Sequence, residues 1–301
     1  MAKRLPPATP VARSSRQRNA ATEHLTQVEM ERAQQVEAVR RRLAHLEQLH
    51  RTVFTESTRE VVPSPVLPKF VKLLATAEKQ ALKGVGLRDG RSRKSARARA
   101  REQAEHWALD LMALADSERN RRQAEVDRRW TGLQANEPAI VAPMLSAAFA
   151  SGQRPVRVVA VIGGEVGLLV TTSGLSVVPE WKPAVTPSGA PMLHIMTETD
   201  RAAWQRQVVA SQMLLAAKQA MALSPGLAAA RVIAVDAVGT PVAAACIPRD
   251  RLHQADWRLD AWWILTWLDP SARFHARAFT GELLTIDLRS DEAFRPLVGA
   301  R

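Results

Sequence analysis

Two charged side chains near the middle of the chain have the types and the spacing that metal-dependent chemistry requires. Glu180 and Lys182 stand two positions apart in the run LSVVPEWKPAV, residues 175–185. Residues two apart in an extended strand point to the same face, so a carboxylate and an amine would lie side by side. The carboxylate could hold a divalent ion, usually Mg²⁺. The amine could orient an attacking water or stabilise the charge of a phosphate.

A metal site built on Glu180 needs a second acid from a neighbouring strand. Glu165 begins the preceding strand-like run, EVGLLVTTS, and is the available candidate. We therefore expect Glu165 and Glu180 as the metal ligands and Lys182 as the third catalytic residue, with Mg²⁺ as the cofactor if the site is catalytic. The alternative is an ordinary hairpin that carries Glu180 and Lys182 at its solvated end.

A second group of charged residues could contact phosphates directly. Seven of the fourteen residues from Arg88 to Arg101 are Lys or Arg, and only Asp89 opposes them. The segment leads into a helical pattern over about 95–132, so the basic run could form the first turns of that helix. The predicted nucleic-acid-binding residues are Arg91, Arg93, Lys94, Arg97, Arg99 and Arg101. The alternative is a mobile, solvated surface segment without a ligand.

The net charge of +12 is concentrated in the first half of the chain. Residues 1–150 contain 27 Lys or Arg and 17 Asp or Glu, whereas residues 151–301 contain 15 and 13. A basic first half attracts polyanions, of which nucleic acid is the commonest. DNA or RNA is therefore the expected partner. A solvated, arginine-rich helical face would have the same composition.

The pattern of residues divides the chain into three parts. Residues 1–20 are polar and basic, as expected of a disordered tail. Residues 21–135 read as a helical, basic region resembling a coiled coil, interrupted by prolines at VVPSPVLP (61–68) and followed by a second helix over about 69–83. Residues 136–301 read as an α/β domain.

The first predicted helix, about 21–54, has an apolar seam with alternating spacings of three and four residues. The seam consists of Val36, Val39, Leu43, Leu46, His50 and Val53, with His50 out of character. Two interpretations remain open. The helix could pack on its own chain, or residues 21–54 could bind a second copy or another protein.

After residue 136 the predicted order is α-β-β-β-(β)-α-β-β-α-β, with the fourth strand over 188–196. The fold class is therefore α+β: a long helical N-terminal half followed by a mixed-sheet α/β domain. This order, with an acid on the second strand and Glu-x-Lys on the third, resembles the PD-(D/E)XK nuclease superfamily over about residues 137–245. The resemblance implies a restriction-endonuclease-like fold and Mg²⁺-dependent cleavage of DNA.

The sequence departs from that family at one position. The second strand carries Gly167 where the family has a metal-binding Asp. Either Glu165 replaces the missing acid, or the domain binds without cutting, or the likeness is accidental. The expected function is a nucleic-acid-associated protein with a nuclease-like, degenerate or active, C-terminal domain. The alternative is a non-catalytic interaction or structural protein whose α/β domain is a docking module.

Several other classes of protein do not fit the sequence. The single cysteine, Cys246, excludes an intrachain disulfide framework, and the seven scattered histidines form no zinc motif. No run of about 18 apolar residues indicates a membrane span. The basic start has no apolar segment of a secretory signal, so the expected location is the cytoplasm.

Overall fold

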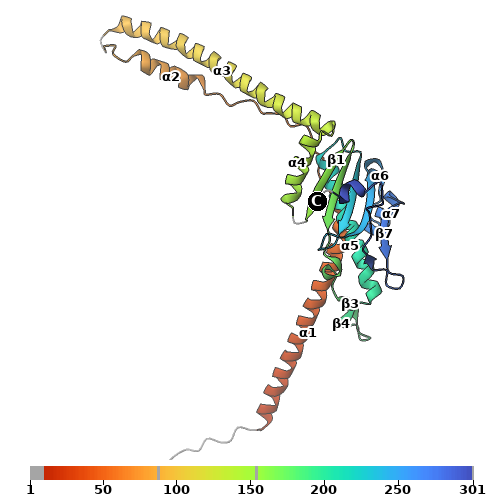
Figure 1. Cartoon of the computed structure of the whole chain (residues 1–301). Coiled ribbons are helices and arrows are strands. Elements are labelled where there is room, and N and C mark those ends of the chain that lie inside the picture. The colour runs from red at the N-terminus through yellow and green to blue at the C-terminus, as the bar shows by residue number, and fades with distance from the viewer. Residues whose placement is uncertain (1–9, 87–88, 153–154, 300–301) are drawn as a thin grey trace, which may run out of the picture. The chain divides into compact units, whose positions relative to one another are not determined.

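The computed structural model describes residues 10–86, 89–152 and 155–299, and side chains in the first helix from residue 27 onward. The chain forms two compact units. Unit 1 combines Met1–Glu56 with Asn136–Arg301, and unit 2 is Ser57–Ala135. Helices dominate the first half of the sequence and a mixed sheet dominates the second (Figure 1). This confirms the predicted α+β class.

The first helix belongs to unit 1 and not to a separate helical region. Helix α1, Pro10–Gln48, begins inside the segment 1–20 that the sequence predicted as a tail; residues 1–9 lie outside the described part. A short 3-10 turn, η1 (Leu49–Arg51), follows. The seam residues Val36, Leu43 and Leu46 are buried, and Leu43 packs on Val178 and Met196 of the same unit. That half of the seam is used within the chain.

Unit 1 is built on a six-stranded sheet of order β1-β2-β5-β6-β7-β8. Strands β2 and β5 run parallel, and the other neighbouring pairs are antiparallel. Strands β2 and β5 read as largely apolar runs because helix α5 and the C-terminal segment pack on them. The strands are β1 Val156–Ile162, β2 Glu165–Thr171, β5 Ala229–Val235, β6 Pro241–Pro248, β7 Arg273–Ala276 and β8 Leu283–Leu284.

A parallel pair requires a crossover, and helix α5 (Glu198–Leu223) provides it between β2 and β5. Thr197 starts this helix with a capping box: its side chain accepts from the Asp200 N–H, and the Asp200 carboxylate accepts from the Thr197 N–H. The helix packs against β5 and β2 and buries an almost continuous apolar surface. Helices α4 (Pro138–Ala150) and α7 (Ala261–Leu268) pack on β1 and α5, respectively.

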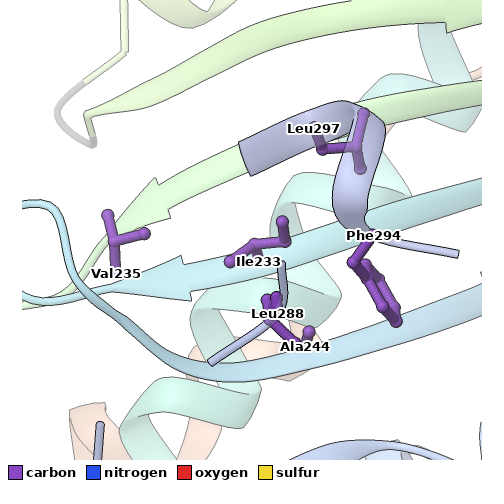
Figure 2. Close-up of a cluster of buried hydrophobic side chains, with 6 residues drawn as sticks. All are labelled: Ile233, Val235, Ala244, Leu288, Phe294 and Leu297. Atoms are coloured by element: carbon purple, nitrogen blue, oxygen red, sulfur yellow. The ribbon is translucent and has the colours of Figure 1, made fainter. Parts of the chain in front are cut away.

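The C-terminal segment closes a second apolar cluster on the sheet. Phe294 and Leu297, at the short helix α8 (Arg295–Val298), lie over Ile233 and Val235 of β5 (Figure 2). Ala244 of β6 and Leu288 of the C-terminal segment complete the cluster, and all six side chains are buried. Helix α6 (Arg249–Gln254) follows β6 directly. The C-terminal segment thus takes part in the core of unit 1.

The third predicted strand does not join the main sheet, which corrects the expectation that it neighbours the strand that begins at Glu165. Residues 174–177 form a 3-10 turn, η2 (Gly174–Val177), and strand β3 (Trp181–Val185) pairs only with β4 (Pro191–Ile195). Pro183 within β3 has no N–H to donate, which suits a two-stranded ribbon and not a central strand. The place beside β2 is taken by β5 instead.

Unit 2 is an antiparallel helical pair that packs through small side chains. Helix α2 (Phe70–Ala81) contacts helix α3 (Gly90–Gln134), as Figure 1 shows. Ala77 of α2 and Ala100 and Ala104 of α3 are fully buried, flanked by Leu73, Leu74, Ala81 and Trp107. The long helix that the sequence predicted over 95–132 is therefore present, and the basic segment forms its first turns.

In the part of the chain that the structure describes, no helix has both the length and the apolar character that crossing a membrane requires.

Candidate nucleic-acid interface and the predicted metal site

Glu165 is the first residue of β2, and a neighbouring strand neutralises its charge. Arg231 of β5 places Nε 2.6 Å from Glu165 Oε2, and Arg231 Nη1 donates to the Ala293 carbonyl. The contact is an ion pair without hydrogen-bond alignment at Nε. A carboxylate that already faces a guanidinium at this distance has lost much of its attraction for a cation.

Lys182 is also paired, with a residue of the capping box of α5. Its Nζ donates to Asp200 Oδ2 over 2.7 Å. The pKa of Asp200 is lowered, first by this hydrogen bond from Lys182 and also by its bonds to Thr197. Glu180 lies just before β3, and its backbone carbonyl accepts from the Met196 N–H. Lys182 therefore serves as a link between β3 and the start of α5.

The structure does not bring Glu165 together with Lys182. Asp200, the partner of Lys182, is in the first turn of α5. Glu165 lies toward the other end of this helix, because the carbonyl of the preceding residue, Gly164, accepts from the N–H of Ala228, which follows α5. Helix α5 has 26 residues, which is about 39 Å at 1.5 Å per residue. The predicted ligand pair Glu165 and Glu180 thus lies on separate sheets toward opposite ends of α5.

The metal-binding position that the family likeness suggested is also closed sterically. Gly167 lies in the middle of β2, and a Cβ added there would collide with the buried side chain of Leu297. The glycine allows the C-terminal segment to pack directly on the sheet. Within the described ranges, no group of three His, Cys, Asp or Glu residues could hold a metal ion.

The six predicted phosphate-binding residues all occupy the surface at the start of one helix. We call this surface the basic tip; it consists of Arg91, Arg93, Lys94, Arg97, Arg99 and Arg101, all in the first three turns of α3. Arg93 is half-buried and the other five are exposed. Asp89 caps the helix by accepting from the Ser92 N–H and hydroxyl, which lowers its pKa.

Alanines explain why the arginines point outward. Ala96, Ala100 and Ala104 recur every four residues, which places them on one face of a helix, and this face is buried. Arg91, Lys94, Arg97 and Arg101 recur at three, three and four residues on another face. Burying the small alanines lets α2 approach α3 closely, and this leaves the long basic side chains in water.

The cations of the basic tip are largely unopposed. Arg101 pairs with Glu105 over 3.2 Å, in an exposed contact. Among the residues that the structure describes, the other five have no carboxylate within 4.0 Å. An exposed ion pair such as that of Arg101 stabilises a protein by only about 0–1 kcal/mol, so a phosphate could displace Glu105.

The later half of α3 is different, because two of its arginines, Arg121 and Arg122, are held by carboxylates. Glu118 contacts Arg121 over 2.8 Å and Arg122 over 2.7 Å, and Arg121 also reaches Glu125. Hydrogen bonds from Arg121 and Arg122 lower the pKa of Glu118 to about 2. Arg59 and Asp127 form a further bidentate pair.

The structure also reveals a polar group that sequence patterns did not single out. Lys218 of α5 lies in a cavity beside Trp257, and its Nζ donates to the carbonyl of His50. His50 itself is fully buried, with Nε2 2.9 Å from the Leu259 carbonyl. The one sequence signal for this region was His50, the polar residue in the apolar seam of the first predicted helix. Lys218 has no sequence feature that distinguishes it from other lysines on helices.

Comparisons of the chain with protein-family models, with curated proteins and with solved structures find no match, so the geometry alone bears on function.

Proposed function

We propose that this protein binds nucleic acid through the basic tip, by contacts to the phosphate backbone. The observation that carries the proposal is the set of five exposed or half-exposed cations on one helix that have no carboxylate partner in the described structure. The proposal does not include Mg²⁺-dependent cleavage by Glu165, Glu180 and Lys182, because these residues are not assembled into one site.

The dimensions of the basic tip suit a duplex. From Arg91 to Arg101 the helix rises about 15 Å, and duplex DNA carries about nine phosphate charges over that length. Arg91, Lys94, Arg97 and Arg101 line one face of the helix, so several of them can reach phosphates at the same time. If all six cations displaced counterions, the logarithm of the binding constant would fall with the logarithm of the salt concentration with a slope of about −5.

The recognition would be independent of base sequence. Arginine and lysine contacts to phosphate position a protein on the duplex but carry no sequence information. Residues 79–101 contain no aromatic side chain that could stack on a base. We therefore expect similar affinities for duplexes of different sequence, and binding to RNA through the same phosphate contacts.

The test is a binding titration of the full chain with a fluorescent 24-base-pair duplex. The variant Arg91→Gln, Lys94→Gln, Arg97→Gln and Arg101→Gln removes four charges from the tip with a residue that favours helix. The matched control removes four charges farther along α3: Arg121→Gln, Arg122→Gln, Arg128→Gln and Arg129→Gln.

We expect the tip variant to weaken binding about a hundredfold or more at 0.1 M salt, and the control to weaken it several-fold at most. Equal losses would assign binding to net charge and contradict a specific role for the tip. Failure of the unmodified chain to bind duplex DNA and RNA at low salt would refute the proposal altogether.

A further inference from the structure

A cavity of about 290 Å³ in unit 1 combines an apolar wall with the half-buried cations Lys218 and Arg249. Phe54, Met221, Leu252 and Trp257 supply the apolar wall, and Lys218 stands among them on α5. The volume lies near the lower end of the range of about 300–1,000 Å³ found for small-molecule sites. A ligand of this cavity would therefore be small.

Lys218 lacks an anionic partner. Its Nζ donates to the His50 carbonyl over 3.0 Å and lies 3.9 Å from the centroid of a Trp257 ring. Within the described ranges, no carboxylate lies within 4.0 Å of its ammonium group. Burial lowers the pKa of Lys218 to about 8. A cation taken partly out of water without an opposing charge is costly, and an incoming anion would offset that cost.

Arg249 adds a second cation to the same cavity. Its Nε donates to the Leu227 carbonyl, and its Nη2 donates to the Met221 and Ser224 carbonyls at the end of α5. No hydrogen bond from Nη1 is made within the part of the chain that the structure describes. The guanidinium is thus held in a fixed position with one nitrogen free to bind a ligand.

The cavity contains fewer acids than cations. Arg51, Lys218 and Arg249 line it together with Glu56, which is exposed. Burial lowers the pKa of Arg249, and the charge of Glu56 partly offsets this effect. Glu56 therefore acts on Arg249 from the solvent side without reaching contact distance, so the interior keeps an excess of positive charge.

We propose that this cavity binds a small carboxylate with an apolar body. The carboxylate would contact Lys218 and Arg249, and the body would pack on Phe54, Met221 and Trp257. This site is separate from the basic tip: its cations are desolvated and lie beside an aromatic wall, which suits a compact organic anion better than a polyanion. The inference stands whether or not the chain binds nucleic acid.

The test compares three probes that share one body and differ in the head group. They are 3-phenylpropionate, 3-phenylpropanol and 3-phenylpropylamine, titrated into the full chain by calorimetry at pH 7. We expect saturable binding of the carboxylate, binding at least about tenfold weaker for the alcohol, and none for the amine, because charge-assisted hydrogen bonds favour the carboxylate.

Two substitutions then locate the charge. Lys218→Met keeps the length and apolar stem of the side chain, and it should weaken 3-phenylpropionate to the level of the alcohol without changing the alcohol. Glu56→Gln removes the exposed acid and should strengthen carboxylate binding about threefold. Lys182→Met, which removes a lysine at the other end of α5, is the matched control and should leave both probes unchanged.

The proposal is overturned if the three probes bind equally, if none binds, or if folded Lys218→Met binds the carboxylate as tightly as the unmodified chain. Circular dichroism shows whether Lys218→Met is folded. Should it unfold, the ranking of the three probes and the direction of the Glu56→Gln effect still decide, because Glu56 is exposed and lies outside the core.

Discussion

The two halves of helix α3 treat charge in opposite ways. Residues 90–101 contain six basic residues and no acidic one, whereas residues 102–134 contain five basic and seven acidic residues. In the later half, acids stand three or four positions from Arg121 and Arg122, the spacing at which helix side chains meet, and the structure pairs them. In the first half, Arg91, Lys94 and Arg97 have no acid at that spacing. Arg93 has Asp89 and Arg99 has Glu102, but among the described residues only Arg101 is in an ion pair, with Glu105.

The cations of the first half reduce the stability of the helix, so helix stability alone does not explain why they are there. Like charges four positions apart, such as Arg93 and Arg97, destabilise a helix by a few tenths of a kcal/mol per pair. A sequence optimised only for folding would place acids among them, as it does farther along the same helix. The accumulation of unopposed cations therefore points to a ligand that supplies the negative charge.

The same comparison extends to unit 1. Glu165 and Lys182 have the residue types of a metal site, but each is paired with an opposite charge, Arg231 and Asp200 respectively. Lys218 is unpaired like the tip residues, but half-buried, and its pKa is lowered accordingly. The structure shows whether each charged group is paired and how far it is exposed. These two properties distinguish structural from functional charges better than residue type does.

The largest expected effect comes from a substitution in the buried alanine face of α3, the face that packs on α2. Ala100→Asp would bury a carboxylate between α2 and α3 and should reduce the free energy of unfolding of unit 2 by about 3 kcal/mol. Ala98→Asp places the same residue on the exposed face two positions away, where about 0.5 kcal/mol is expected from helix propensity. Urea denaturation followed by circular dichroism measures both; similar losses would contradict the packing described for α3.

A second prediction concerns Lys218, the half-buried cation without a carboxylate partner. Its pKa of about 8 lies below its ordinary value of 10.5, so the unfolded chain binds the proton more tightly than the folded chain. The resulting penalty is present below pH 8 and is relieved as the pH rises from 8 to 10.5.

The stability of the unmodified chain relative to Lys218→Met should therefore increase over this interval, as measured by urea denaturation at pH 7.5 and pH 10. Lys94→Met, at an exposed site of the tip, is the control and should show no such change. A pH-independent difference for Lys218→Met would contradict the burial assigned to this lysine.

The smallest expected effect tests whether ion pairs with carboxylates keep the arginines in the later half of α3 from contributing to DNA binding. Glu118→Gln releases Arg122 and removes one of the two carboxylate partners of Arg121, and it should raise the affinity for duplex DNA about twofold. Asp110→Asn makes the same change in net charge without releasing an arginine, and it should have a smaller effect. Equal gains from both substitutions in a fluorescence titration would show that only net charge matters.

Much of the secondary structure could be predicted from the sequence, because it is local. The basic helix, the capped helix α5 and the strands β2, β5 and β6 follow from periodicity and from turn residues. The partner of β2 could not be predicted. Its neighbour β5 lies about sixty residues later, and residues 175–185 have an equally apolar, strand-like pattern but form η2 and β3.

The candidate sites differ in the same way: features that depend on local sequence were predictable, and contacts between distant segments were not. The position of the six cations on the first turns of a helix was predictable, since it depends on local sequence; their contact with nucleic acid stays a prediction. The metal-site hypothesis depended on two strands meeting, and Pro183 together with the packing of Leu297 on Gly167 directed the chain elsewhere. Lys218 became a candidate only when the fold placed His50 and Trp257 against it.

The salt dependence of binding tests the central claim most directly. The logarithm of the binding constant for a 24-base-pair duplex is measured against the logarithm of the salt concentration for three chains: the unmodified protein, Lys94→Gln with Arg97→Gln, and Arg121→Gln with Arg122→Gln. The two double variants have the same net charge. We predict that the slope loses about 1.8 in magnitude for the tip variant, at about 0.9 per lost phosphate contact, and is unchanged for the other. An equal loss of slope in both variants would contradict the assignment of phosphate contacts to the basic tip.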